Sequence, residues 1–343
     1  MRQIINWGII GLGNVAQTFS EGFKNINNAR LLAISSLNTK KLEQFKNKFN
    51  IEEKYTFDTY EDLLNCKNID IIYITLPNNL HYEWIIKCIE KNKKILVEKP
   101  AVLKFIDAKN IEKQILEKNL FYTEGYMYRY YPLIKQVIEI IKNGQIGNLI
   151  SMETSYGLNL LTKKNFIFFE KKKKIDANNR QFNKKLGGGC ILDLGCYPAS
   201  FSLLIASLVK NVNHKKFKIS NIKKKIGPTG VDIDAECELF FDGGFKSKIK
   251  ASFENDIGNK SIINGTKGIL NINDTWIEAN EVDKIIDNKK EVIKNKLTMN
   301  NYSYQIENIS SSILENKNKT SFPGFTIEDT LLNTKILENW LNA

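Results

Sequence analysis

The sequence predicts an α/β protein in two parts: an N-terminal doubly wound parallel sheet, and a C-terminal α+β domain with a large open, mostly antiparallel sheet. Over roughly the first 120 residues, short apolar runs alternate with helical patterns, which is typical of βαβ units. A glycine-rich turn follows the first apolar run, and strands of period two occur in the second part. We therefore predict two domains, residues 1–122 and 123–343.

The N-terminal part alternates strands and helices as a parallel sheet requires. Strands are predicted at residues 4–10, 31–34, 69–75, 95–97 and 120–122. Helices are predicted from residue 14 onward and at residues 40–49, 79–90 and 104–118. Ligands of open parallel sheets bind beyond the carboxyl ends of the strands, so site residues are expected in the turns that follow them.

The C-terminal part has a different pattern. Helices are predicted at residues 132–142, 302–314 and 327–341. Residues 234–240 and 245–253 alternate apolar and polar side chains, and Asp242-Gly243-Gly244 joins them as a hairpin. Period-two strands with one polar face indicate an antiparallel or mixed open sheet.

Composition excludes several classes of protein. The formal net charge is +12, but lysine is abundant along the whole chain, and the stretch Lys215–Lys225 indicates a solvated loop, so we predict no nucleic-acid partner. Five cysteines without a CxxC pair and only two histidines argue against disulfides and against a metal site. The N-terminus does not resemble a signal peptide, and no window approaches the ~18 uninterrupted apolar residues that span a bilayer. We expect a cytoplasmic protein without membrane contact.

The first motif runs from Gly8 to Ala16 between the first strand and the first helix. Gly11 allows a tight turn, and Gly13 lets the backbone approach a pyrophosphate at the N-terminus of the helix, where Asn14 and Val15 lie. Glycines also mark ordinary turns. The strand–turn–helix context nevertheless predicts a dinucleotide-binding Rossmann domain.

The end of the second strand bears on the choice of cofactor. An NAD-specific domain usually carries an acidic residue there, but the sequence reads Ser35-Ser36-Leu37-Asn38-Thr39-Lys40. The hydroxyls of Ser35 and Ser36 with nearby lysines could hold a 2′-phosphate. Alternatively, the serines only begin a loop. NADP is therefore favoured, with NAD as the alternative.

A second motif follows the strand at residues 69–75. The turn contains four residues expected to contact the cofactor, Leu76, Pro77, Asn78 and Asn79, and a fifth in the next helix, His81. The two asparagines could hydrogen-bond a ribose or the nicotinamide. Asn79 could instead cap the helix, or do both.

The third motif is Glu98-Lys99-Pro100, directly after the strand at residues 95–97. A lysine at the carboxyl end of a strand points into the cofactor cleft, where its ammonium can polarise a substrate oxygen and transfer a proton. Glu98 could bond the ribose or pair with a lysine. The alternative is an ordinary surface lysine, but Pro100 restricts Lys99 to extended geometry and favours the catalytic interpretation.

The fourth motif places Asp193 and Tyr197 after the glycine triplet Gly187–Gly189. On a helix over residues 189–204 these two side chains share a face, so that together they could orient a substrate hydroxyl and relay its proton. A buried, hydrogen-bonded structural aspartate is the alternative.

In this order the four motifs resemble the Gfo/Idh/MocA oxidoreductase family, most closely its dihydrodiol dehydrogenase and D-xylose dehydrogenase group. Three further segments resemble the family: Glu124–Pro132, Asn179–Phe182 and Gly265–Gly268. The resemblance implies reversible oxidation of a secondary alcohol or hemiacetal carbon on a sugar, polyol or related diol. It also implies a dimer or tetramer formed through the C-terminal sheet.

The resemblance also implies roles for single residues. Lys99 matches the family's catalytic lysine and Asp193 its helical aspartate, while Tyr197 stands where many members carry histidine. Tyr128 and Arg180 are expected to line the substrate site together with these three. Arginine is often found in this group at the position of Leu37. A non-catalytic NAD(P)-binding regulator on the same fold is the alternative function.

Overall fold

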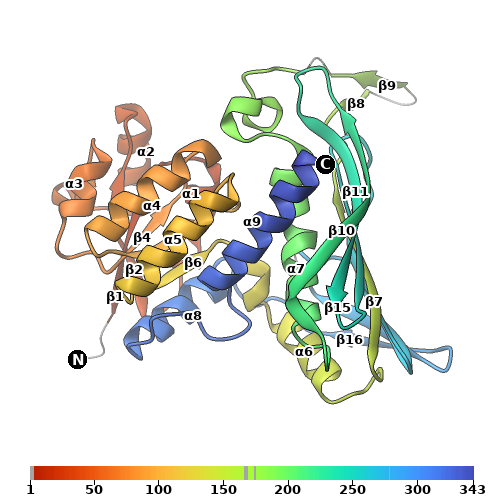
Figure 1. The fold of residues 1–343 in the computed structure, drawn as a ribbon. Helices are drawn as coiled ribbons and strands as arrows, with labels where there is room; N and C mark the ends of the chain where they lie inside the picture. Colours follow the sequence, from red (N-terminus) through yellow and green to blue (C-terminus); the bar gives the residue numbers. More distant parts are fainter. Residues whose placement is uncertain (1–3, 166–168, 174, 278) are drawn as a thin grey trace. The chain divides into compact units, whose positions relative to one another are not determined.

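The computed structural model describes residues 4–165, 169–173, 175–277 and 279–343 (Figure 1). The chain forms two compact units, Met1–Tyr130 with Thr298–Leu331, and Tyr131–Leu297 with Leu332–Ala343. These differ from the predicted ranges because residues 123 and 124 bond to a distant segment. The Thr123 hydroxyl donates to the carbonyl of Phe325 at 2.7 Å, and the Thr330 hydroxyl donates to Glu124 at 2.7 Å.

The first unit contains a six-stranded parallel sheet of order β3-β2-β1-β4-β5-β6. Its strands are β1 (Ile5–Ile10), β2 (Ala29–Ser35), β3 (Thr56–Phe57), β4 (Ile71–Ile74), β5 (Lys94–Val97) and β6 (Tyr122–Glu124). The doubly wound parallel sheet predicted from the sequence is confirmed. The strand order changes direction between β1 and β4, and ligands of such sheets bind at that point.

Helices cover both faces of this sheet. On one face, α3 (Tyr60–Asn65), α4 (His81–Glu90) and α5 (Phe105–Glu117) pack in a single apolar cluster with side chains of the strands. On the other face, α1 (Asn14–Glu21) and α8 (Ser303–Leu314) pack around the fully buried Trp7. The indole of Trp7 donates to Ser310 at 3.0 Å, which ties α8 to β1. Helix α2 (Thr39–Phe49) begins at the Asn38 cap.

The second unit contains an eight-stranded sheet of order β10-β11-β12-β7-β13-β14-β15-β16. Its strands are β7 (Leu149–Gly157), β10 (Asn213–Ile226), β11 (Asp232–Asp242), β12 (Lys246–Ser252), β13 (Gly258–Gly265), β14 (Gly268–Ile272), β15 (Glu281–Ile286) and β16 (Lys289–Lys294). Only β12 and β7 run parallel among these neighbours, so the open, mostly antiparallel sheet is confirmed. β11 and β12 form the predicted hairpin.

The helices of the second unit are α6 (Pro132–Lys142), α7 (Cys196–Ala206) and most of α9 (Ile327–Asn342). A short pair, β8 (Thr162–Asn165) and β9 (Phe169–Lys172), lies outside the main sheet. The stretch Lys184–Ala206 is long and apolar enough to cross a membrane, but its most apolar window is wholly buried, as in a core helix. The Ser202 hydroxyl bonds to that of Ser247 at 2.7 Å, which fixes α7 on β12.

The lysine-rich stretch Lys215–Lys225 was predicted as a loop, and this prediction is wrong. It lies in β10, the edge strand of the eight-stranded sheet. Exposed lysines there alternate with half-buried residues such as Phe217 and Ile219. Charged side chains on an edge strand oppose pairing with the strands of other molecules, so a strand can carry this composition.

Candidate functional site

The glycine turn between β1 and α1 is shaped by contacts to two neighbouring strands. The Gly11 amide donates to the Ser35 carbonyl at 3.1 Å, and the Thr75 hydroxyl donates to the Gly11 carbonyl at 2.5 Å. Gly11 has a φ of +87°, and a Cβ there would lie 2.8 Å from a methyl of Leu76. The turn therefore requires glycine at residue 11.

Gly13 has the opposite environment. It is exposed, it immediately precedes α1, and a Cβ built on it meets no atom within 4 Å. Asn14 and Val15 are also exposed in the first helical turn, which contains no acidic residue. The free backbone N–H groups of a helix N-terminus bind anions. An open glycine beside such a terminus fits the pyrophosphate of a dinucleotide.

The two serines at the end of β2, Ser35 and Ser36, are less accessible to a ligand than the sequence suggested. Ser35 is fully buried and its hydroxyl donates to the Thr59 carbonyl at 2.8 Å, so its predicted role as a phosphate ligand is not supported. Ser36 is 5% exposed, and its hydroxyl accepts from the Asn38 amide at 3.2 Å. Both serines are buried at the carboxyl end of β2, which explains why their hydroxyls bond to the protein. Lys40 and Lys41 nearby are exposed.

The turn after β4 leads through a short 3₁₀ segment, Asn78–Leu80, into α4. Helix α4 begins at His81 with Leu80 in the cap position, so the proposed capping role of Asn79 is wrong. Asn79 is exposed, Pro77 is half-buried, and Leu76 and Asn78 are buried. The turn thus presents Asn79 at the carboxyl edge of the sheet.

The side chain of His81 is enclosed by the protein. Its ring is fully buried, with Nδ1 2.9 Å from the Pro100 carbonyl and Nε2 2.7 Å from the Leu76 carbonyl. These contacts give the ring a structural role, and the cofactor contact predicted for His81 stays a prediction. His81 links the turn after β4 to the turn after β5, and no sequence pattern indicated that the two turns share this partner.

Lys99 lies in the turn after β5 and is half-buried. The Glu98 carboxylate accepts from the Tyr73 hydroxyl and, at 3.3 Å, from the Lys99 amide. The Lys99–Pro100 peptide bond is cis. The turn is thus ordered by side chains of β4 and of its own first residue.

Tyr128, predicted to line the substrate site, lies in the 3₁₀ segment Met127–Tyr130 and is fully buried. Its ring contacts that of Tyr126 edge-on, with centroids 6.2 Å apart. The neighbouring Arg129 is also buried, 3.8 Å from Asp329 and over the ring of Phe325.

In the second unit, Asp193, Arg180 and Gln181 are brought together. Asp193 is 5% exposed; one of its oxygens accepts from Arg180 at 3.1 Å and the other from Gln181 at 2.9 Å. The contact to Gln181 was not predicted, although the segment Asn179–Phe182 had been singled out. The helix predicted over residues 189–204 is corrected: a π-helical turn at Ile191–Gly195 precedes α7.

Tyr197 is the second residue of α7, and 7% of its surface is exposed. Its ring lies 5.5 Å from that of Tyr156 and 5.8 Å from that of Trp276. Lys99 and the dinucleotide turns therefore belong to the first unit, and Arg180, Asp193 and Tyr197 to the second. The joint action of these residues stays a prediction.

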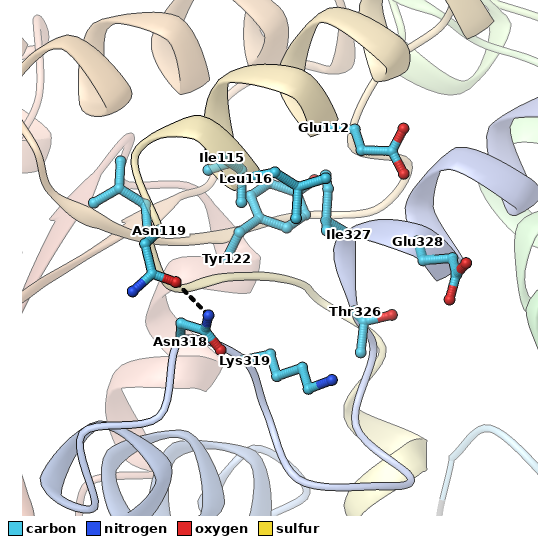
Figure 2. Close-up of a pocket in the computed structure, with 11 residues that line it drawn as sticks. Glu112, Ile115, Leu116, Asn119, Tyr122, Asn318, Lys319, Thr326, Ile327 and Glu328 are labelled. Carbon is cyan, nitrogen blue, oxygen red and sulfur yellow. Dashed lines mark hydrogen bonds between the residues drawn. The ribbon is translucent and has the colours of Figure 1, made fainter.

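A separate cavity of about 360 Å³ lies in the first unit between α5 and two C-terminal segments (Figure 2). Glu112, Ile115 and Tyr122 line it together with Lys319 and Glu328. None of the predicted site residues is part of its wall. This cavity is therefore distinct from the turns described above.

Comparison with known proteins agrees with both units. Residues 5–126 match the GFO/IDH/MocA domain described as "Oxidoreductase family, NAD-binding Rossmann fold", and residues 134–271 match the GFO/IDH/MocA C-terminal domain. Trans-1,2-dihydrobenzene-1,2-diol dehydrogenase of Xenopus tropicalis is 22% identical over 98% of this chain and 96% of its own. D-xylose 1-dehydrogenase (NADP(+)) of Hypocrea jecorina is 26% identical over 57% of this chain and 52% of its own.

A solved structure shows the same fold. The crystal structure of aldose-aldose oxidoreductase from Caulobacter crescentus, complexed with glycerol, gives a TM-score of 0.83 at 19% identity, with 98% of this chain and 96% of that chain covered. The two domain matches together span more than half of the chain, in the order that the sequence motifs predict. The chain therefore belongs to the GFO/IDH/MocA family of oxidoreductases.

Proposed function

We propose that the protein transfers a hydride between a nicotinamide cofactor and a secondary alcohol or hemiacetal carbon of a sugar, polyol or related diol. The observation that carries this proposal is the placement of three turns in one unit. The turns after β1, β4 and β5 carry Gly11–Gly13, Leu76–Asn79 and Glu98–Pro100, and these strands are neighbours in the sheet. A dinucleotide on the first turn has its reactive end within the region that the other two border.

The residues of the chain have separate roles in this proposal. Lys99 donates a hydrogen bond to the reacting oxygen and moves its proton. Tyr197 assists as a proton relay, and Asp193, held by Arg180 and Gln181, positions the substrate. When bound, the nicotinamide supplies or accepts the hydride. The protein's share is orientation and electrostatics.

We propose NADP(H) as the preferred cofactor. No carboxylate follows β2 at residues 35–40, and the exposed Lys40 and Lys41 lie where a 2′-phosphate could be bound. The relative from Hypocrea jecorina carries NADP(+) in its name. The Ser35 hydroxyl donates to the Thr59 carbonyl, so the proposed preference for NADP(H) rests on Lys40 and Lys41.

The substrate class rests on the relatives, which are named for a diol and for D-xylose. We also propose a cytoplasmic location and a dimer or tetramer formed through the eight-stranded sheet. Light scattering after gel filtration measures the subunit number.

The test has two stages. A thermal-shift screen with NAD(H) and NADP(H) is expected to show stabilisation, larger for the phosphorylated pair. A panel of aldoses, polyols and trans-diols, followed at the nicotinamide absorbance, is then expected to give turnover on at least one member. Tight cofactor binding without hydride transfer to any of them would favour a regulatory protein.

A further inference from the structure

The turn that carries Lys99 is held at three consecutive residues by polar side chains. The Lys99 amide donates to Glu98 at 3.3 Å, the Pro100 carbonyl lies 2.9 Å from the His81 ring, and the Ala101 amide donates to Glu124 at 2.8 Å. The partners come from the turn itself, from α4 and from β6. Each of these three backbone groups therefore has a different side chain as its partner.

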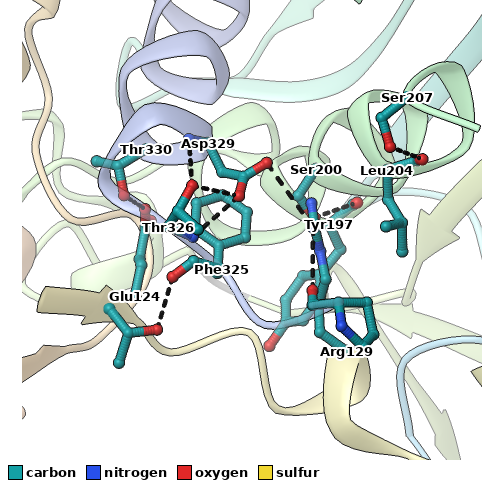
Figure 3. A network of polar contacts seen from close by, with 12 residues as sticks. Glu124, Arg129, Tyr197, Ser200, Leu204, Ser207, Phe325, Thr326, Asp329 and Thr330 are labelled. Carbon is teal, nitrogen blue, oxygen red and sulfur yellow. Dashed lines mark hydrogen bonds and ion pairs between the residues drawn. The ribbon is translucent and has the colours of Figure 1, made fainter. Parts of the chain in front are cut away.

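Of the three partners, Glu124 is the most distant along the sequence. It ends β6, next to β5 in the sheet, and its residue is 1% exposed. One carboxyl oxygen accepts from the Ala101 amide at 2.8 Å, and the other accepts from the Thr330 hydroxyl at 2.7 Å. Figure 3 shows Glu124 and Thr330 facing each other beside Thr326 and Asp329. The carboxyl group thus bridges the catalytic turn to the start of α9.

The partners of Glu124 are themselves fixed. Thr330 is fully buried, and the adjacent Asp329 carboxylate accepts from both the amide and the hydroxyl of Thr326. Asp329 also lies 3.8 Å from the buried guanidinium of Arg129. A carboxyl group held at both oxygens by buried donors cannot turn away from Ala101 without losing a bond.

The protonation of Glu124 is also unusual. Burial, assisted by the nearby carboxylates of Glu98 and Asp329, raises the pKa of this carboxyl to about 7, although the hydrogen bonds from Thr330 and Ala101 lower it. The charge of Glu124 also helps burial to raise the pKa of Tyr122, on the same strand. Near neutral pH a glutamine side chain, which is neutral and of the same length, is therefore a close mimic.

We propose that Glu124 is a positioning residue for the reaction: by holding the Ala101 amide, it fixes the backbone from which Lys99 reaches the substrate oxygen. The inference rests on the proposed function of Lys99. Because a displacement of ~1 Å at a reacting group can cost about 100-fold in rate, loss of this anchor lowers kcat while the glycine turn still binds the cofactor.

The test separates the reach of the side chain from its charge. Glu124→Gln keeps an oxygen at the same distance from Ala101 but removes the charge, whereas Glu124→Asp keeps the carboxyl group and shortens the side chain by one carbon. Thr330→Val removes only the second hydrogen bond, and serves if the aspartate variant does not fold. Asp283→Asn is the matched control, since Asp283 is a buried carboxylate of β15 that pairs with Lys290 at 2.8 Å in the other unit.

At pH 7 and well below each melting temperature, kcat of Glu124→Asp is expected to fall by about tenfold or more, with the NADP(H) dissociation constant within about twofold of wild type. Glu124→Gln is expected to keep at least about a third of kcat, Thr330→Val to fall between the two, and Asp283→Asn to match wild type. Equal turnover in wild type and Glu124→Asp would overturn the inference. So would a Glu124→Gln enzyme as slow as Glu124→Asp, or a loss of cofactor affinity equal to the loss of kcat. Absence of hydride transfer by the wild-type protein would instead refute the proposed function, and the inference with it.

Discussion

The imidazole Nδ1 of His81 lies 2.9 Å from the carbonyl oxygen of Pro100, the residue after Lys99. The other ring nitrogen lies 2.7 Å from the Leu76 carbonyl. Both contacts join a ring nitrogen of His81 to a backbone carbonyl. One buried side chain therefore links the turn at Leu76–Asn79 to the turn that carries Lys99, and the two turns are expected to move together.

Replacing His81 by leucine is expected to lower the free energy of unfolding by about 1–3 kcal/mol, since the contacts of the ring to two backbone carbonyls are lost. Urea denaturation measures the change. His214→Gln is the control, because His214 lies on the edge strand β10 and is half-buried; its effect is expected to stay within about 0.5 kcal/mol. A His81→Leu protein as stable as wild type would show that the ring does not brace the turns.

The two glycines of the first turn are expected to respond differently to alanine. Gly13→Ala adds a Cβ that meets no protein atom, so the stability should be unchanged while NADP(H) affinity falls, because the new methyl lies where the pyrophosphate approaches. Gly11→Ala, at φ +87°, is expected to cost about 1–2 kcal/mol of stability. Melting curves with and without cofactor separate the two effects. Normal cofactor affinity in a folded Gly13→Ala protein would contradict the placement of the dinucleotide.

The raised pKa of Glu124 has a consequence for stability. Its folded-state pKa of about 7 lies above the unfolded-state value, so the folded protein holds the proton more tightly. The contribution of Glu124 to stability therefore falls as the pH rises from about 4.5 to about 7, by up to about 3 kcal/mol. Urea titrations at pH 5 and pH 8 should show a smaller difference for Glu124→Gln than for wild type. Identical pH dependence in the two proteins would mean that Glu124 is ionised when folded.

The two hydrogen-bond donors to Asp193, Arg180 and Gln181, are expected to contribute unequally to the free energy of unfolding. Arg180 has 43% of its side chain exposed, and exposed ion pairs contribute about 0–1 kcal/mol. The hydrogen bond from Gln181 to the other oxygen, at 2.9 Å, is expected to contribute about 1.5–3 kcal/mol because its acceptor is a charged, buried group. Gln181→Ala should therefore destabilise the protein more than Arg180→Ala in urea titrations. The reverse order would show that charge dominates this contact.

Most of the fold follows from periodicity and turn residues. The helix predicted at residues 132–142 has those bounds in the structure, because Pro132 fixes its start and Asn143-Gly144 its end. The alternation around Cys237 and Ile249 likewise predicted the faces of β11 and β12, where both side chains are buried. The two-residue strand β3 is too short to carry a pattern. The many lysines of β10 obscured the alternating pattern of this edge strand, because its inner face is only half-buried.

In the candidate site, too, some features could be predicted from the sequence and others could not. Gly11, Gly13 and Lys99 follow strands, and position along a strand can be seen in the sequence. The partners of Ser35, His81 and Glu124 cannot, because each is a backbone group that only the tertiary fold brings near: Thr59, Pro100 and Ala101. Glu124 did carry one signal, since it ends a strand beside the one before Lys99.

Turnover by a Lys99→Met protein is the most direct measurement. Methionine has a similar length and no proton to donate, so NADP(H) should still raise the melting temperature while kcat on the substrate found falls by at least about 100-fold, the contribution of a general acid–base group. Near-normal kcat in that variant, with cofactor bound, would contradict the role of Lys99 in the reaction.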